Sequence, residues 1–245
     1  MNDNERIKKL SSLIDRGGVV FFGGAGVSTE SGIPDFRSEN GLYSRKYDHP
    51  PEEMLSHGFF FSHTREFFEF YGKAILCCLD VSPNPAHRLC AKWEKEGVLD
   101  AVVTQNIDGL HTAAGSKNVF ELHGSVMRNR CIECGRKYPA EYIRKSEGIP
   151  RCACGGIIKP DVVLYGEPLD GETVNGAARA IAAAKTLIVA GTSLSVYPAA
   201  GMIDIFGGDA LVLINRQSLA AEARADLTIH GSVGEVLSAA EKLRQ

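Results

Sequence analysis

The sequence predicts an α/β protein with a Rossmann-like, doubly wound parallel sheet into which a smaller lobe is inserted. Short apolar runs of strand length alternate with amphipathic helical segments over most of the 245 residues, and this alternation is typical of a parallel sheet with helices on both faces. Residues 38–86 and 125–160 break it, because the first stretch is rich in aromatic residues and the second carries four cysteines. We expect these stretches to pack together as the smaller lobe, with a ligand cleft between the lobes.

The elements of the larger domain follow from apolar periodicity. Residues 5–16 form a helical stripe that Gly17 and Gly18 end. We expect further helices at 87–96, 171–184, 197–206 and 233–244, and strands at 19–22, 101–104, 119–122, 186–190, 210–214 and 227–229. The larger domain therefore comprises residues 1–37, 87–124 and 161–245, and the smaller lobe comprises a helical module (38–86) and a cysteine-bearing module (125–160).

Composition and charge exclude several classes of protein. Apolar residues make up 44% of the chain, enough for a sizeable core, and 27 basic against 30 acidic residues give a net charge of −3, which argues against direct binding of nucleic acid. The first ten residues are too charged for a signal peptide, and no apolar run reaches the roughly 18 residues of a membrane span. We expect a cytoplasmic protein that does not contact a membrane, and no oligomeric interface is legible in the sequence.

The cysteines of residues 125–160 form two close pairs. Cys131 and Cys134 are followed by Cys152 and Cys154. Four thiolates in two pairs are the ligand set of a structural zinc ion, since no coordination position then stays open for catalysis. Free thiols or disulfides are the alternative, which a reducing cytoplasm and an odd total of seven cysteines disfavour. We expect one zinc ion in a ribbon-like module.

A glycine-rich turn follows the first expected strand. The stretch GGAGVSTESGIPDFR, residues 23–37, places Gly24 and Gly26 where a backbone can approach a pyrophosphate, as in dinucleotide sites. Thr29 occupies the third glycine position of that fingerprint, and a proline-bearing loop replaces the helix. Dehydrogenases also need an acidic residue at the end of a second strand about 20 residues on, and we expect no strand there. Hydride transfer is therefore the weaker of two possible uses of a nicotinamide cofactor.

Polar side chains gather where further strands end. Gln105, Asn106 and Asp108 follow the strand 101–104, and His123 follows the strand 119–122. The carboxyl ends of parallel strands form the ligand-binding edge of open α/β sheets, and histidine is the usual general base near neutral pH. Taken singly, Asp108 is compatible with a turn cap and His123 with a structural histidine. Their shared edge favours a catalytic role for His123, Asn106 and Asp108.

Two more strand ends extend this edge. Gly191, Thr192 and Ser193 form a turn whose free N–H groups suit a phosphate or a ribose, and Asn215 ends the next strand. Each turn alone is compatible with ordinary turn chemistry. Together, four strand ends with polar or glycine-rich loops on one edge are the footprint of a dinucleotide.

These stretches, in this order, resemble the sirtuins, a family of NAD-dependent protein lysine deacylases. The resemblance rests on GAGVSTESGIPDFRSENGLY (24–43), TQNIDGLH (104–111), ELHGS (121–125), KPDVVLYGE (159–167), GTSLSVYPAA (191–200) and LIN (213–215). The four paired cysteines also fall where the family has them, and Tyr165 stands where phenylalanine is more usual. The motifs cover almost the whole chain, so the resemblance is specific.

The resemblance implies a deacetylase of the bacterial or archaeal type that consumes NAD. The acyl-lysine carbonyl oxygen attacks C1′ of the nicotinamide ribose, and nicotinamide leaves. His123 then acts as general base on a ribose hydroxyl, which attacks the imidate carbon. Acetyl-lysine, NAD and water thus give lysine, nicotinamide and O-acetyl-ADP-ribose. An ADP-ribosyltransferase on the same scaffold is the nearest alternative, a non-catalytic NAD sensor is more distant, and an oxidoreductase is the least favoured.

The resemblance also assigns roles around the cofactor. The first NAD loop would use Gly24, Ala25, Gly26, Thr29, Phe36 and Arg37, with Phe36 shielding the ribose face. The nicotinamide riboside would meet Gln105, Asn106, Ile107 and Asp108, where Asp108 holds the amide and Asn106 orients the ribose. The phosphates and adenosine would meet Gly191, Thr192, Ser193 and Asn215, and the last loop, at Ser232 and Val233, would close over adenine.

The substrate side follows from the same resemblance. The peptide would add as a strand between residues 162–166 and 191–197, in contact with Val162, Val163, Tyr165, Gly166 and Val196. Relatives that prefer succinyl- or malonyl-lysine carry a Tyr-x-x-Arg pair in a helix of the small lobe, and Phe68 and Tyr71 occupy those positions here. With no cation to pair with an acyl carboxylate, we expect proteins or peptides with acetyl-lysine or another uncharged acyl-lysine as substrates.

Overall fold

A six-stranded parallel sheet forms the centre of the computed structural model, which describes residues 1–35, 41–44 and 47–244. Its strands lie in the order β3-β2-β1-β7-β8-β9, and each neighbouring pair is parallel. The bounds are β1 (Val19–Gly23), β2 (Leu99–Thr104), β3 (Val119–Glu121), β7 (Thr186–Ala190), β8 (Ala210–Asn215) and β9 (Leu227–His230). The predicted fold class is confirmed, and the strand ends differ from expectation by one or two residues at most.

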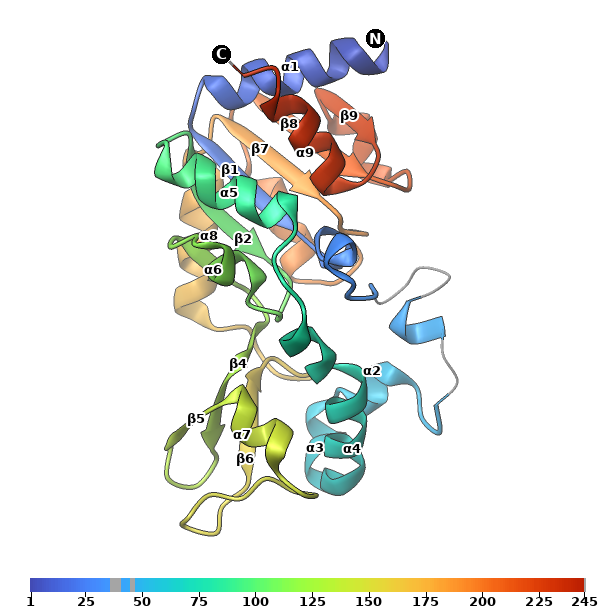
Figure 1. Cartoon of the computed structure of the whole chain (residues 1–245), viewed down its shortest axis with the longest axis vertical. Helices are drawn as coiled ribbons and strands as arrows, with labels where there is room; N and C mark the ends of the chain where they lie inside the picture. The colour runs from blue at the N-terminus through green and yellow to red at the C-terminus, as the bar shows by residue number, and fades with distance from the viewer. Residues whose placement is uncertain (36–40, 45–46, 245) are drawn as a thin grey trace.

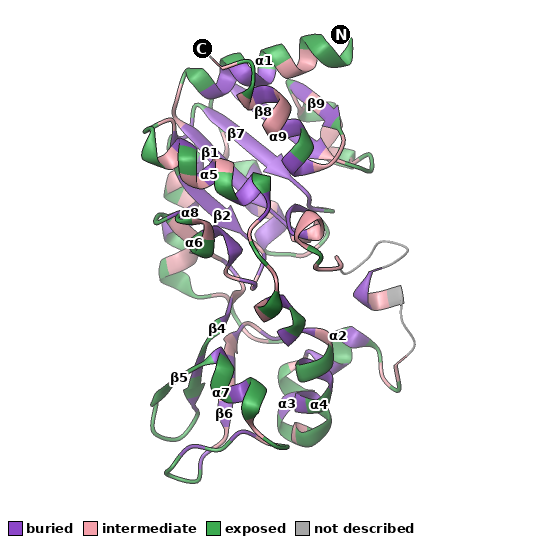
Figure 2. Ribbon diagram, in the orientation of Figure 1, coloured by how far each residue is buried: buried purple, intermediate pink, exposed green. Residues whose placement is uncertain are grey.

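Helices cover both faces of this sheet. Successive side chains of a strand point to opposite faces, so each apolar strand needs a packing partner on both sides. Phe21 packs with α1 (Asp3–Asp15), α5 (Pro85–Lys95) and α9 (Val233–Glu241) in one hydrophobic cluster. Phe22 packs with α8 (Gly171–Ala183) and the 3₁₀ helix η5 (Ala199–Ile205) in another. Figure 2 shows the strands of this sheet largely buried between the helices, as a doubly wound sheet requires.

Four expected helices differ from the structure by two residues or more, and the first of them, α1, begins at Asp3 where residue 5 was expected. The segment 197–206 forms the 3₁₀ helix η5 over Ala199–Ile205, because Pro198 precedes it and Gly201 interrupts it, which leaves no uninterrupted run long enough for a stable α-helix. Helix α5 begins two residues earlier than expected, since Asn84 caps it by accepting from the N–H of Ala86 at 2.9 Å. Helix α9 ends at Glu241, and the chain continues to residue 244 in a turn in which the N–H groups of Leu243 and Arg244 bond to the carbonyls three residues back.

The two inserted stretches share one hydrophobic cluster in the lower part of Figure 1. Phe60, Phe67 and Tyr71 come from the helical stretch, and Val126 and Ile158 from the cysteine-bearing stretch. The first contributes η3 (Leu42–Ser44), α2 (Pro51–Met54), α3 (His57–Ser62), α4 (Thr64–Ala74) and η4 (Leu76–Asp80). The second contributes β4 (Gly124–Cys131), β5 (Lys137–Pro139), α7 (Ala140–Lys145) and β6 (Ile158–Val162), with the strands in an antiparallel sheet of order β5-β4-β6.

The remaining short elements lie in loops of the larger sheet. They are η1 (Ala25–Val27), η2 (Thr29–Ser31), α6 (Leu110–Ala114) and η6 (Ala220–Arg224). None of the helices in the described part of the chain has the length and apolar character of a membrane span.

The turns that follow β1 and β7 are in direct backbone contact. The N–H of Gly26 donates to the carbonyl of Gly191 at 2.7 Å, and Gly191 has a left-handed φ of +58°. A Cβ on Gly191 would lie 2.5 Å from the nitrogen of Val27. Glycine is therefore required at position 191 both for its backbone conformation and for this close approach.

Replacing Gly191 with alanine should lower the free energy of unfolding by about 2–4 kcal/mol, through left-handed strain and the backbone clash together. Gly97 is a matched control, because its φ is also positive, at +74°, but a Cβ there meets nothing within 4 Å. Gly97→Ala should lose only about 1 kcal/mol. Urea unfolding of both variants measures the difference, and equal losses would show that the close approach has no energetic weight.

Candidate functional site

A cavity of about 690 Å³ opens beside the carboxyl ends of β1, β2, β7 and β8 and is closed on its other side by the small lobe. Its volume is within the range of small-molecule sites. Most predicted site residues line it: Gly24, Ala25, Gly26, Thr29, Gln105, Asn106, Ile107, His123, Val162, Val163, Tyr165, Gly166, Gly191, Thr192, Ser193, Val196, Asn215, Ser232 and Val233. Asp108 lies behind this wall, and Phe36 and Arg37 lie outside the described residues.

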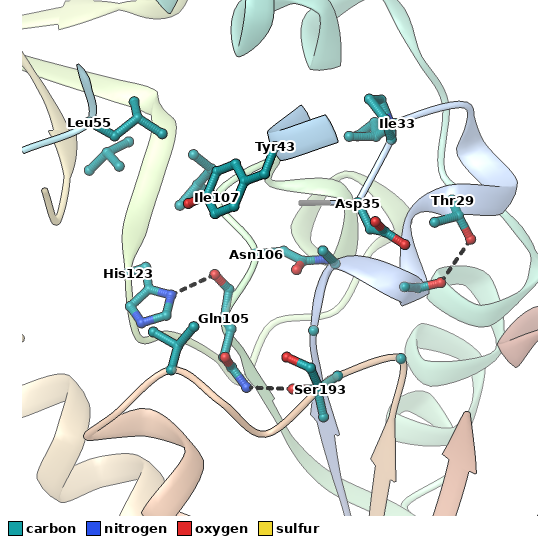
Figure 3. Close-up of a pocket in the computed structure, with 18 of the residues that line it drawn as sticks. Thr29, Ile33, Asp35, Tyr43, Leu55, Gln105, Asn106, Ile107, His123 and Ser193 are labelled. Carbon is teal, nitrogen blue, oxygen red and sulfur yellow. Dashed lines mark hydrogen bonds between the residues drawn. The ribbon is translucent and has the colours of Figure 1, made fainter. Parts of the chain in front are cut away.

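His123 projects into this cavity from the loop between β3 and β4 (Figure 3). Its Nδ1 lies 2.9 Å from the carbonyl oxygen of Gln105. A carbonyl oxygen can only accept, so Nδ1 carries the proton and Nε2 of the neutral ring keeps a free lone pair. Burial lowers the pKa of His123 from 6.5, against a smaller opposing effect of the Gln105 hydrogen bond. The ring is therefore a neutral base at pH 7.

Behind the cavity wall, the hydroxyl of Ser28 joins the loops after β1 and β2. Ser28 Oγ donates to Asp108 Oδ2 at 2.6 Å and accepts from Asn106 Nδ2 at 3.0 Å. The other oxygen of Asp108 accepts from the N–H of Leu110 at 2.9 Å, so the turn-cap role coexists with the buried contact. Because the amide nitrogen of Asn106 faces Ser28, its side-chain oxygen is left to accept a hydrogen bond from a ligand.

A buried histidine supports Ser28 from the start of α5. His87 Nδ1 accepts from the N–H of Asn84 at 3.2 Å, and His87 Nε2 lies 3.4 Å from Ser28 Oγ. Burial lowers the pKa of His87 to about 4, although the negative charge of Asp108 acts in the opposite direction. The neutral ring thus donates from Nε2, and Asp108 is the only formal charge among these groups.

The residues predicted to bind the phosphates and the adenosine line another part of the cavity. Gln105 Nε2 donates to Thr192 Oγ1 at 3.1 Å, which ties the loop after β2 to the loop after β7. Asn215 donates to the carbonyl of Gln217 at 3.1 Å, and Arg216 donates to Ser232 Oγ at 3.0 Å. The structure therefore brings the four predicted strand ends to one ligand surface.

The small lobe holds one edge of residues 162–166, the segment that is predicted to contact the substrate peptide. Tyr165 donates from its N–H to the carbonyl of Leu55, and its own carbonyl accepts from the N–H of His57, both at 2.9 Å. The N–H of Val163 donates to the carbonyl of His123 at 3.0 Å. A peptide strand would therefore have to pair with other main-chain groups of the segment.

Several residues of the site could not be identified from the sequence. Leu55 and Tyr71 reach the cavity from α2–α4, and only the tertiary docking of those helices puts them there. Ser28 lies within the quoted glycine-rich stretch, but its spacing resembles an ordinary turn. His87 follows a helix cap, and its contact with Ser28 joins residues 59 positions apart.

The four paired cysteines form a separate cluster, and its geometry suits zinc. Their sulfur atoms all lie within 4.8 Å of one another, with Cys131–Cys154 and Cys134–Cys152 at 3.5 Å. A tetrahedral zinc–thiolate site with bonds of about 2.3 Å has sulfurs about 3.8 Å apart. The hydroxyl of Tyr138 donates to the sulfur of Cys152 at 3.0 Å, as outer-shell groups do for metal-bound thiolates.

Comparison with known proteins shows the family of the chain. The model of the Sir2 family matches residues 24–198. An NAD-dependent protein deacetylase of Clostridium acetobutylicum is 56% identical, covering 95% of this chain and 97% of its own. Two solved Sir2 structures are each 39% identical to this chain and cover 96% of it. The first, with a deacetylated p53 peptide and 3′-O-acetyl ADP-ribose, is matched over 97% of its own length with a TM-score of 0.89. The second, with a p53 peptide and NAD+, is matched over 98% of its own length with a TM-score of 0.85. The chain belongs to the Sir2 family.

Proposed function

We propose that the protein is an NAD-dependent protein lysine deacetylase that converts acetyl-lysine, NAD and water to lysine, nicotinamide and O-acetyl-ADP-ribose. The observation that carries the proposal is the free Nε2 of His123 in a cavity lined by the loops at the carboxyl ends of the parallel strands. Relatives named as NAD-dependent protein deacetylases and Sir2 structures with NAD+ and peptide support it.

The residues divide the chemistry between them. The glycines of the β1 and β7 turns let the dinucleotide phosphates approach the backbone, and Asn106 offers its side-chain oxygen to a ribose hydroxyl. After the acyl oxygen has displaced nicotinamide at C1′, His123 Nε2 takes the proton of the ribose hydroxyl, and that oxygen attacks the former carbonyl carbon. Asp108, held by Ser28 behind the cavity wall, would supply a fixed negative charge toward the nicotinamide side.

The cavity favours an uncharged acyl group. Arg216 is the only Lys or Arg among its described lining residues, and it lies with Asn215 and Ser232 at the adenosine side. Phe68 and Tyr71, the two positions that decide acyl charge in the family resemblance, are both buried. An acyl carboxylate at the lysine side would therefore lack a cation and be desolvated without compensation.

We further propose that Cys131, Cys134, Cys152 and Cys154 hold one structural zinc ion, which would fasten β4 to the loop before β6. The same four thiols need a reducing environment, which supports a cytoplasmic location. We also propose that residues 1–37, 87–124 and 161–245 act as the NAD-binding domain and that residues 38–86 and 125–160 form the small lobe.

The proposed reaction is tested by incubating the protein with NAD and an acetyl-lysine peptide and following the products by mass spectrometry. Wild type should release nicotinamide and form O-acetyl-ADP-ribose, and His123→Ala should lose about 10²–10⁴-fold in kcat because the general base is gone. A succinyl-lysine peptide of the same sequence should react much more slowly.

Three other outcomes would contradict the proposal, and each would indicate a different function. ADP-ribose attached to protein would indicate a transferase, NADH an oxidoreductase, and unchanged NAD a binding protein. Tyr142→Phe is the control for substitution itself, since Tyr142 lies in α7 outside the cavity, with its hydroxyl 2.8 Å from the carbonyl of Arg151. It should turn over peptide at the wild-type rate.

Metal analysis should find one zinc ion per chain, and Cys131→Ala should abolish it. The variant should also lose several kcal/mol of unfolding free energy, because a structural zinc site contributes directly to folding. Cys77→Ala is the control: Cys77 is exposed and outside the cluster, so zinc content and stability should be retained. Zinc-free wild type together with a Cys131→Ala variant of unchanged stability would refute the site.

A further inference from the structure

Two tyrosine hydroxyls meet where the cofactor side and the peptide side of the cavity come together. The hydroxyl oxygens of Tyr43 and Tyr165 lie 2.9 Å apart, and both residues line the cavity. Tyr43 belongs to η3, which follows the glycine-rich turn in the chain, and Tyr165 belongs to the segment 162–166. A phenylalanine at either position would lack this hydrogen bond. It joins residues 122 positions apart, so it links two otherwise separate walls of the site.

Tyr165 is the fixed partner of this pair. Its backbone is bonded on both sides to the small lobe, at Leu55 and His57, and pairs in parallel with Ser56. Just beyond it, Glu167 Oε2 accepts from the N–H of Leu164 at 2.9 Å and from Lys159 Nζ at 3.0 Å. Removing only the Tyr165 hydroxyl leaves all these bonds in place.

Tyr43 connects this anchor to the cofactor side. Its neighbour Leu42 is 3% exposed and belongs to the small-lobe cluster, and the N–H of Leu42 donates to the carbonyl of Asp35 at 2.7 Å. Asp35 and Ile33 line the cavity on the same stretch as Thr29. A restraint on Tyr43 is therefore passed by one backbone hydrogen bond to the cavity wall that continues from the glycine-rich turn.

We propose that the Tyr43–Tyr165 hydrogen bond couples the binding of the dinucleotide to the binding of the acyl-peptide, with Tyr165 as a positioning residue. The proposal rests on the proposed function. The backbone of Tyr165 is held by the small lobe, and a peptide strand beside residues 162–166 would restrict its side chain as well. Through the hydrogen bond this restricts Tyr43 and the wall at residues 33–35, so that less freedom is lost there when the dinucleotide binds. Linkage requires the dinucleotide to tighten peptide binding by the same factor.

The coupling is measured by titrating ADP-ribose into the protein calorimetrically, with and without saturating acetyl-lysine peptide. ADP-ribose is the probe because NAD would be consumed. Peptide should tighten ADP-ribose binding about 2- to 10-fold in wild type, the equivalent of one net hydrogen bond. In Tyr165→Phe, in Tyr43→Phe and in the double variant this factor should fall close to one, since each of these changes removes the Tyr43–Tyr165 hydrogen bond.

The control is again Tyr142→Phe, which makes the same chemical change outside the cavity and should keep the wild-type factor. Thermal melting of all variants shows that they remain folded. An unchanged factor in Tyr165→Phe, a wild-type factor of one, or tighter ADP-ribose binding in the variants would each overturn the coupling. Wild type that fails to bind ADP-ribose at all would instead contradict the proposed function.

Discussion

The site depends on one buried hydroxyl group, that of Ser28, which is 1% exposed. A serine has one proton to donate and two lone pairs, and here the proton goes to Asp108 while Asn106 and His87 donate in return. Three segments meet at this point: the turn after β1, the loop after β2 and the start of α5 (Figure 1). Because every bond has a defined direction, the amide of Asn106 is fixed with its oxygen available to the ligand. These hydrogen bonds are in place without a ligand, so the arrangement is preorganised.

Hydrogen-bond direction also fixes which ring nitrogen of His123 carries the proton. The carbonyl of Gln105 fixes the proton on Nδ1 of His123, and the side chain of Gln105 reaches Thr192 in the loop after β7. One residue therefore orients the base and joins the β2 loop to the expected phosphate-binding turn. Burial lowers the pKa of His87 and of His123, so His123 is available as a neutral base at physiological pH. Such a site suits a reaction that transfers a proton from a hydroxyl and requires no hydride acceptor.

Much of this architecture could be predicted from the sequence, because each strand is a short apolar run that ends in a polar or glycine-rich loop. Parallel strands bring those ends to one edge, so the sequence alone suffices to place residues as distant as Thr29 and Asn215 in one site. The contributions of Leu55, Tyr43 and His87 could not be predicted in this way. They depend on how helices dock and on single contacts between distant segments, which leave no periodicity in the chain. The segment 197–206 was expected to be an α-helix and is a 3₁₀ helix, since helical apolar spacing does not reveal the effect of Pro198 and Gly201.

The proposed chemistry depends most directly on His123 being a neutral base with a free Nε2. Nitrogen-15 NMR of histidine-labelled protein measures this, with the His123→Ala spectrum to assign the signals. We predict a proton on Nδ1 at pH 7 and a pKa below 6.5, so that the charged form, and with it the loss of kcat, appears only as the pH falls below that value. A neutral ring protonated on Nε2, or a pKa above 7, would contradict this assignment.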